Sequence, residues 1–514
     1  MRVFIFAIGG TGSRVLTSMI MQLAAGVRPK DEQGKDIPNL SIVPILVDPH
    51  EDNAGLLELT ELLDNYRRIR KRIYGDKTDV EGFFSVKIET LKDTNPRSVS
   101  SDKFYFKMQR VSENSFEKFI NKSEMDLENR LFSDLLFSRS ELNTKMREGF
   151  YGSPNIGCVA LNEFKNSPDF DAFRSAFRYD ERYPEQSDKL FFIGSIFGGT
   201  GASGLPLFIS SIRDLEHEDN EDEGKTNCAK APIGALVVMP YFSIEADEES
   251  PINDVEFAIK TRSALRYYDT NLNRYINNIY YVADPIGTDD FENDPGNRNN
   301  QKGNKAHFVE FVGGLSIFDF ISDSNVEVVD DNMGRKVAAS TKTKAYGLRN
   351  DSNYIKFTDL ANATNNLCLL PLLKFHILRL FMEKFFDDFL AKPFANKFEP
   401  RIEKSVKTRD LESFFKEYDR WIEEMKSHGS NAHNLDLFEK LSGKEFSKLA
   451  RGISPKRGIL YGQKSFNATD ILSALNDIAP KYNKMTSADE RWFTIANSAL
   501  EDVVNNNLDY KTLI

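Results

Sequence analysis

Short, almost unbroken apolar runs punctuate the first 285 residues and alternate with segments of helical periodicity. Such runs lack the polar–apolar alternation of half-exposed strands, so they indicate β-strands buried on both faces, as in parallel sheets. The predicted strands cover residues 2–8, 41–47, 156–161, 190–196, 233–239 and 278–283. Helices are predicted between them, for example over 13–26, 204–215 and 252–274. This alternation predicts an α/β fold with a doubly wound, mostly parallel sheet.

The remaining pattern is helical. Residues 54–148 are predicted to form a mostly helical insertion, and a central helix is predicted at 306–322, where Gly313 and Gly314 indicate close packing against the sheet. From about residue 360 onward, large apolar residues recur every three or four positions, which is typical of core-facing helices. The predicted domains are therefore 1–305, with the central helix at 306–322, and a largely helical C-terminal domain at 323–514.

Composition excludes several classes of protein. The 514 residues are 40% hydrophobic and 12% aromatic, which is enough to build a large core and excludes global disorder. The net charge of −11 argues against nucleic acid as the main partner and against a polybasic membrane-surface protein. Three widely spaced cysteines exclude a disulfide framework and a cysteine-rich zinc site, and they suit a reducing compartment.

The sequence also predicts no membrane span and a cytoplasmic location. No apolar stretch approaches the ~20 residues that a spanning helix needs. The apolar run 3–8 near the N-terminus has six residues and stops at Gly9, so it is shorter than the roughly seven to fifteen residues of a signal-peptide core.

Two glycine turns carry the candidate chemistry. Each follows a predicted strand and precedes a helix, where glycine permits close approach of the backbone and the helix start offers free N–H groups and a positive dipole end. The first comprises Gly9, Gly10, Thr11, Gly12 and Ser13, and the second comprises Gly198, Gly199, Thr200, Gly201, Ala202 and Ser203. Neither fits the G-x-G-x-x-G or G-x-x-x-x-G-K-[ST] pattern. Two such turns on one sheet predict a polyphosphate site.

With its supporting motifs, the second turn (Phe197 to Gly204) resembles the glycine loop of the tubulin/FtsZ superfamily, and most of all its bacterial tubulin-like branch. Phe197 stands where that loop has a glycine. The supporting motifs occur in the family's order and are the first turn, Asp48 after the second strand, residues 149–157, and Val237-Val238-Met239-Pro240-Tyr241-Phe242. The resemblance covers about residues 1–360.

The resemblance implies a site for GTP or GDP with Mg²⁺. In it the residues of both glycine turns would hold the phosphates, and Asp48 would act near the Mg²⁺ through water. Ser153 and Pro154 would form the loop facing the γ-phosphate, and Asn304 or His307, at the start of the central helix, would face the base. A helix cap is the alternative role for Asn304.

In this superfamily a neighbouring subunit completes GTP hydrolysis with carboxylates that orient water. The nearest candidate segment is 353–360, where Lys356 occupies the position of the first acid and leaves Asp359 as the catalytic candidate. A lysine cannot accept a proton from water at neutral pH unless it is strongly desolvated. Either the register differs by one residue, or hydrolysis is slow or absent, or the subunit contact differs.

The sequence therefore predicts a tubulin-like GTP-binding protein whose nucleotide state controls self-assembly into oligomers or filaments, or recruitment of a partner. The alternative is a nucleotide-bound scaffold that does not hydrolyse GTP, with the phenylalanine-rich C-terminal helices as its docking surface. A Rossmann-type dinucleotide enzyme is disfavoured, because the first turn lacks the third glycine of that fingerprint.

Overall fold

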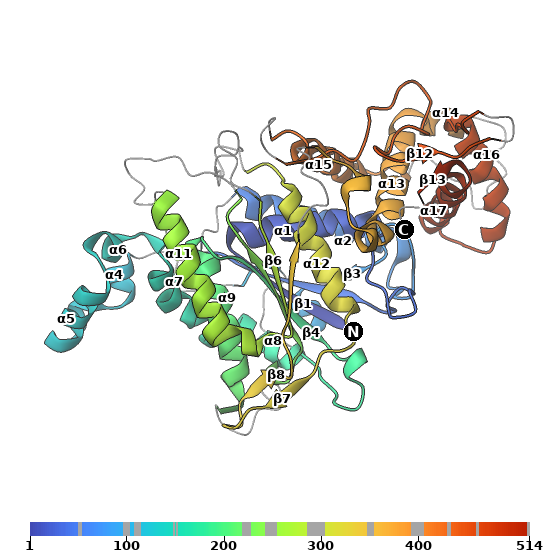
Figure 1. Ribbon diagram of the computed structural model, residues 1–514. Coiled ribbons are helices and arrows are strands. Elements are labelled where there is room, and N and C mark those ends of the chain that lie inside the picture. The colour runs from blue at the N-terminus through green and yellow to red at the C-terminus, as the bar shows by residue number, and fades with distance from the viewer. Residues whose placement is uncertain are drawn as a thin grey trace.

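The computed structural model (Figure 1) describes residues 1–49, 54–95, 103–106, 115–146, 150, 153–217, 228–241, 254–284, 304–346, 354–391, 406–428, 433–458 and 462–510. Some residues named in the sequence analysis lie outside these ranges. They are 96–102, 107–114 and 147–148 of the predicted insertion, 149 and 151–152 of the motif 149–157, 252–253 of the predicted helix 252–274, Phe242 and Asn353.

The centre of the molecule is a seven-stranded parallel sheet, which confirms the predicted α/β class. Its strand order is β3-β2-β1-β4-β5-β6-β9. The strands are β1 (Arg2–Ile8), β2 (Ser41–Val47), β3 (Lys87–Ile88), β4 (Lys189–Ser195), β5 (Ile233–Val238), β6 (Asn278–Val282) and β9 (Lys342–Tyr346). Five of the six predicted strands are present. The edge strands β3 and β9 were not predicted, because two and five residues carry little periodicity.

Both faces of the sheet are buried, and β1 shows how. Val3, Ile5 and Ala7 belong to one hydrophobic core, whereas Phe4 and Phe6 belong to the other. On the first face lie α1 (Gly9–Ala24), α2 (Ala54–Tyr74) and α12 (Phe308–Ser322); on the second lie α7 (Pro154–Leu161), α8 (Pro168–Ala176), α9 (Gly199–Arg213) and α11 (Asp254–Tyr267). The continuous apolar runs are thus explained by helices on both sides.

The prediction of a strand at 156–161 is wrong, because this segment lies within helix α7. Pro154 occupies its first turn, where the missing N–H costs nothing. Buried Ile156, Gly157, Ala160 and Leu161 recur at helical spacing, whereas Cys158 and Val159 between them are exposed. A run of six apolar residues does not by itself distinguish a strand from a buried helix.

The central helix α12 packs against α1 and the sheet, as predicted from its two glycines. A Cβ at Gly313 would lie 2.8 Å from Leu236 Cδ2 of β5 and 3.1 Å from Val15 Cγ1 of α1. A Cβ at Gly314 would lie 2.9 Å from the Gln22 side chain. Any larger residue would therefore force α12 away from its neighbours.

The described residues of the region 54–148 are mostly helical, as predicted, although they also supply β3. Besides α2 it contains α3 (Leu91–Thr94), α4 (Phe116–Phe119), α5 (Leu127–Leu136) and α6 (Arg139–Asn143). Helix α2 carries a run of basic residues, and three of them, Arg67, Arg68 and Arg72, form ion pairs. Arg68 and Arg72 pair with Asp410 and Asp489, which ties α2 to the C-terminal helices.

The C-terminal part contains α13 (Asn362–Lys384), α14 (Phe386–Leu390), α15 (Arg409–Met425), α16 (Ala468–Ile478) and α17 (Ala488–Asn507). Its short strands are β10 (Tyr354–Ile355), β11 (Asn434–Leu435), β12 (Ser454–Pro455) and β13 (Leu508–Asp509). The stripe on α15 formed by Leu411, Phe414, Tyr418, Trp421 and Met425 is buried. It is core packing, as helical spacing predicted.

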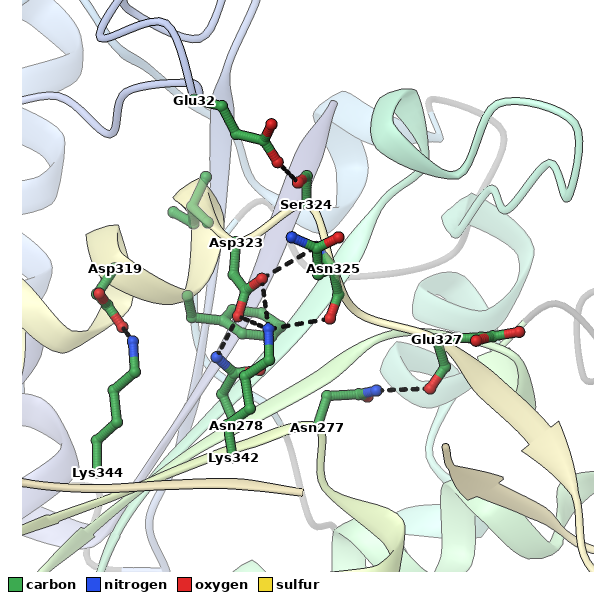
Figure 2. A network of polar contacts seen from close by, with 12 residues as sticks. Glu32, Asn277, Asn278, Asp319, Asp323, Ser324, Asn325, Glu327, Lys342 and Lys344 are labelled. Carbon is green, nitrogen blue, oxygen red and sulfur yellow. Dashed lines mark hydrogen bonds and ion pairs between the residues drawn. The ribbon is translucent and has the colours of Figure 1, made fainter. Parts of the chain in front are cut away.

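A polar network closes the amino-terminal edge of the sheet, where α12 ends (Figure 2). Asp323 accepts hydrogen bonds from Asn278 Nδ2 at 2.9 Å and from Lys342 Nζ at 2.6 Å, so it joins the starts of β6 and β9. Lys189, the first residue of β4, donates to the Ile321 and Asp323 carbonyl oxygens at 3.1 and 2.7 Å. These contacts fix the end of α12 opposite the glycine turns.

Candidate functional site

The two glycine turns lie at the carboxyl ends of β1 and β4, which are neighbours in the sheet. From β1 the chain continues outward through β2 and β3, and from β4 it continues the other way through β5 and β6. The strand order therefore reverses between β1 and β4. In open α/β sheets such a reversal leaves a crevice outside the strand ends, which is where ligands bind.

The turns lie side by side. A Cβ at Gly9 would lie 3.4 Å from Thr200 Cβ and 3.6 Å from the backbone nitrogen of Gly201. Gly9 also has a φ of +71°, a conformation that other residues rarely adopt. Two segments almost 200 residues apart in sequence thus form one continuous backbone surface.

Both turns are helix starts without side-chain caps. Helix α1 begins at Gly9 and helix α9 at Gly199, and their N-cap residues Ile8 and Gly198 make no side-chain capping hydrogen bond. Neither first turn contains an acidic residue. The first N–H groups of a helix have no acceptor within it, and the dipole places positive potential there. The paired starts can therefore bind an anionic group with several charged oxygens.

Some glycines of the turns serve packing. A Cβ at Gly12 would lie 2.7 Å from the Ala7 carbonyl carbon, and one at Gly201 would lie 2.7 Å from the Ser195 nitrogen. These glycines hold α1 and α9 tightly against the ends of β1 and β4. They place the helix starts at the crevice, whatever ligand occupies it.

The hydroxyl groups differ in what they face. Ser203 Oγ donates to the Gly199 carbonyl oxygen at 2.6 Å and is fully buried, and Ser13 Oγ donates to the Gly9 carbonyl oxygen at 3.4 Å. Thr11 Oγ1 accepts from Arg14 Nη2 at 3.5 Å. Both buried hydroxyls therefore donate to carbonyl oxygens of their own helices. Thr200 is partly exposed, and within the described residues its hydroxyl has no hydrogen-bond partner.

Asp48 lies at the same edge. It follows Val47, which is paired in register with Ile8, so the carboxylate-bearing residue stands beside the start of the first turn. The residue is buried, and Tyr105 Oη donates to its backbone carbonyl oxygen. A carboxylate beside an anion site fits a Mg²⁺ that is held mainly by phosphate and water oxygens.

Ser153 and Pro154 begin helix α7 beside the second turn. A Cβ at Gly157 of α7 would lie 2.2 Å from Ser203 Oγ, so α7 and the first turns of α9 are in direct contact. Pro154 also lines an apolar cavity of about 320 Å³ that reaches Phe197 and Ala202 of the second turn. The structure thus brings together the two turns, Asp48 and the start of α7.

A buried charged cluster beside the first turn was not predicted. Arg14 Nε donates to Glu310 Oε1 at 2.7 Å, and Arg14 Nη2 donates to Tyr241 Oη at 2.6 Å. Burial alone would lower the pKa of Arg14, but Tyr241 and Glu310 outweigh it and raise that pKa, so the guanidinium stays charged. The sequence signal for this cluster is weak, because its members are 69 to 296 residues apart.

His307 is enclosed in the protein. Its Nδ1 accepts from the Val309 N–H at 3.2 Å, as a helix cap, and its Nε2 lies 3.5 Å from Asp284 Oδ2. Burial, together with His428 and His433, holds the pKa of His307 well below its usual value, so the ring is neutral and Nε2 carries the proton. The ring therefore serves as the cap of α12 and packs beside Asp284. Asn304, the other candidate for a contact with the base, is half-buried and lies three residues before His307, the cap residue of α12.

Asp359 lies in the C-terminal part of the chain, in the short 3₁₀ helix Phe357–Asp359. Its Oδ2 accepts the backbone N–H of Lys356 at 2.8 Å, which is a capping contact. The preceding strand β10 pairs with β11, so this segment packs with the C-terminal elements.

Comparison of the sequence with models of known protein families found no match, and comparison with characterised proteins found none either. Among the described residues no helix is both long and apolar enough to cross a membrane, and no cluster of His, Cys, Asp or Glu has the geometry of a metal site. The crevice between β1 and β4 is therefore the candidate functional site.

Proposed function

We propose that this protein binds a nucleoside triphosphate with Mg²⁺ at the crevice between β1 and β4, and that the bound nucleotide controls its self-assembly or recruitment of a partner. The observation that carries the proposal is the contact between Gly9 and Thr200, which joins two uncapped helix starts at the point where the strand order reverses. Backbone N–H groups of both starts would hold the phosphates.

The chain's own residues divide the work of binding. Gly9, Gly10, Gly199 and Thr200 would donate to phosphate oxygens, and Asp48 would hold water molecules of the magnesium shell. Mg²⁺ would neutralise phosphate charge when bound. Arg14, held by Glu310 and Tyr241, would add positive potential behind the first turn and keep it in place.

GTP as the nucleotide, and membership of the tubulin/FtsZ superfamily, follow from the motif resemblance of residues 1–360. The strand order and the position of both turns support a nucleotide-binding α/β domain. Assembly and hydrolysis by a neighbouring subunit are part of the same proposal. The second candidate, a nucleotide-bound scaffold without hydrolysis, is favoured by one observation, because the Asp359 carboxylate already caps Lys356.

The decisive experiment is calorimetric titration of the full chain with GTP and with ATP, in the presence of Mg²⁺. Thr200→Val is expected to weaken nucleotide binding by ten- to a hundredfold, since a hydrogen bond to a charged group contributes about 1.5–3 kcal/mol. The matched control is Thr60→Val on α2, whose hydroxyl donates to Leu56 O at 2.9 Å, away from the crevice.

Two further measurements separate the candidates. Phosphate release and pelleting with GTP would support a hydrolysing, assembling protein, whereas bound GTP that persists without pelleting would support the scaffold. Equal affinity of wild type, Thr200→Val and Thr60→Val for every nucleotide would refute the site itself.

A further inference from the structure

Helix α5 stands out from the body of the molecule (Figure 1). It is carried on an arm formed by α4, α5 and α6, and the arm is rooted in the second hydrophobic core. Phe116 and Phe137 pack edge to face there with ring centroids 4.8 Å apart, and Leu142 of α6 is buried in the same core. The arm is therefore an ordered extension of the fold.

The outer surface of α5 is unusually apolar. Five large side chains on this ten-residue helix are 51% to 81% exposed, and they are Leu127, Leu131, Phe132, Leu135 and Leu136. Leu127, Leu131 and Leu135 follow one another at intervals of four, so they form one stripe, and the other two side chains widen it. Contiguous exposed apolar surface of this kind marks an interaction site.

Polar contacts join α5 to its own chain. Among the ten residues of α5, all of which the structure describes, only Ser133 is buried. Lys122 Nζ forms an ion pair with Asp134, and Arg130 Nη2 donates to the Met125 carbonyl oxygen at 3.1 Å. These contacts hold the helix in the arm and leave its five large apolar side chains exposed.

We propose that α5 is a self-association surface, and that it pairs antiparallel with α5 of a second copy of this chain. All five side chains are more than half exposed, so pairing of two copies would remove apolar surface of both helices from water. A two-fold axis makes such a contact closed and self-complementary.

Charge supports the antiparallel arrangement. Glu128 is exposed in the first turn of α5, and Arg139 is exposed at the start of α6, three residues after α5 ends; within the described residues neither has an ion-pair or hydrogen-bond partner. Antiparallel pairing places Glu128 of one copy near Arg139 of the other, twice. The same register sets Leu131 opposite Leu136 and Phe132 opposite Leu135.

The composition of α5 favours protein over lipid as its occupant. A helix that lies on a membrane surface is rich in lysine and arginine on its polar face. Here the polar positions are Glu128, Asn129, Arg130, Ser133 and Asp134. Two acids against one base suit a pairing of copies with Arg139 better than an anionic bilayer.

The first test is sedimentation velocity of the full chain without nucleotide, at about 1–100 µM protein. The interface is independent of the proposed nucleotide site, so its failure would leave that proposal intact. We expect wild-type dimers, and at least tenfold weaker dimerisation of Leu131→Asp/Leu135→Asp with an unchanged melting temperature. The control is Met333→Asp, at the tip of the hairpin β7 (Val328–Asp330) and β8 (Lys336–Ala338), which exposes another large apolar side chain.

The second test determines how the two α5 helices are aligned in the dimer. Glu128→Arg and Arg139→Glu are each expected to weaken the dimer, and the double exchange is expected to restore it. In a Cys158→Ser background, mixing Glu128→Cys with Arg139→Cys protein is expected to give disulfide-linked mixed dimers, whereas each alone gives few.

Three results would overturn the proposal. One is a monomer at every concentration, and another is a dimer that the α5 substitutions do not affect. The third is a monomer that floats with phosphatidylcholine–phosphatidylserine vesicles and loses that binding in Leu131→Asp/Leu135→Asp, which would assign α5 to a lipid surface instead.

Discussion

The Arg14 guanidinium donates to the Glu310 carboxylate across 2.7 Å, and so joins the helix that follows the first glycine turn to the central helix α12. Tyr241 Oη, which follows β5, donates to the same carboxylate at 3.1 Å. Burial raises the pKa of Glu310, and the neighbouring Arg14 opposes that rise. Three elements beside the crevice between β1 and β4 therefore depend on one largely buried charge pair.

Removing one partner of this pair is expected to be costly. Arg14→Leu should lower the free energy of unfolding by about 3–5 kcal/mol, because it leaves the Glu310 charge buried without compensation. The double variant Arg14→Leu/Glu310→Leu should recover much of that loss. Urea denaturation of the wild type, Arg14→Leu, Glu310→Leu and the double variant measures the effect. Purely additive losses in the two single variants would contradict the pairing.

The packing role of Gly12 predicts a loss of stability that does not depend on any ligand. Gly12→Ala should lower the free energy of unfolding by about 1–3 kcal/mol, since its Cβ would lie 2.7 Å from the Ala7 carbonyl carbon. Gly462→Ala is the control, because a Cβ there would meet no atom within 4 Å. Thermal melting without nucleotide should distinguish the two; equal melting temperatures would rule out the close contact.

His376 predicts a pH dependence of stability. Burial, with Arg379 and Lys426, lowers the pKa of His376 to about 3, and its ring stacks on Phe438 with centroids 4.1 Å apart. In the unfolded chain the imidazole takes up a proton near pH 6.5, but the folded protein does not. Its contribution to stability is therefore complete above pH 6.5 and is lost as pH falls toward 3, by about 1.4 kcal/mol per pH unit.

The matching variant is His376→Phe, which preserves the stacking and removes the titrating group. Its stability should fall less steeply than that of the wild type between pH 6.5 and 4.5, as measured by urea denaturation at each pH. Parallel curves for both proteins would show that His376 takes up its proton equally in the folded state.

Replacing Lys189 is expected to weaken the C-terminal end of α12. Burial lowers the pKa of Lys189 to about 8, against the opposing effect of Asp323, and its amine donates to carbonyl oxygens of Ile321 and Asp323. Lys189→Met should leave these oxygens unsatisfied and lower the free energy of unfolding by about 1–3 kcal/mol. Lys342→Met, which removes a partly exposed partner of Asp323, should cost less. An equal or larger loss for Lys342→Met would refute the capping role.

The pH dependence of the same lysine has the same sign as that of His376 but falls in a more alkaline range, because burial lowers both pKa values. Between pH 8 and 10.5 the unfolded chain holds a proton on this amine that the folded protein has released. The contribution of Lys189 to the free energy of unfolding therefore rises with pH over this range. The difference in unfolding free energy between wild type and Lys189→Met should therefore grow in favour of the wild type across that range.

Local patterns predicted the parts of this protein that depend on neighbours in sequence. The apolar runs of β1, β2, β4, β5 and β6 specified the parallel sheet, because burial on both faces leaves no room for polar alternation. The glycine turns were recognised since each stands between a strand and a helix. The run at 156–161 was misread because its burial comes from α9 as much as from the sheet.

Spacing within about twenty residues was enough to predict the α/β class and the buried C-terminal stripes, whereas α1 and α9 begin four and five residues before their predicted starts at residues 13 and 204. Tertiary packing places Gly9 beside Thr200, pairs Arg14 with Glu310, turns Ser203 and His307 inward, and leaves the apolar side chains of α5 exposed. The physical reason is that contact between distant segments depends on strand order and helix packing, and neither of these leaves a periodic trace along the chain.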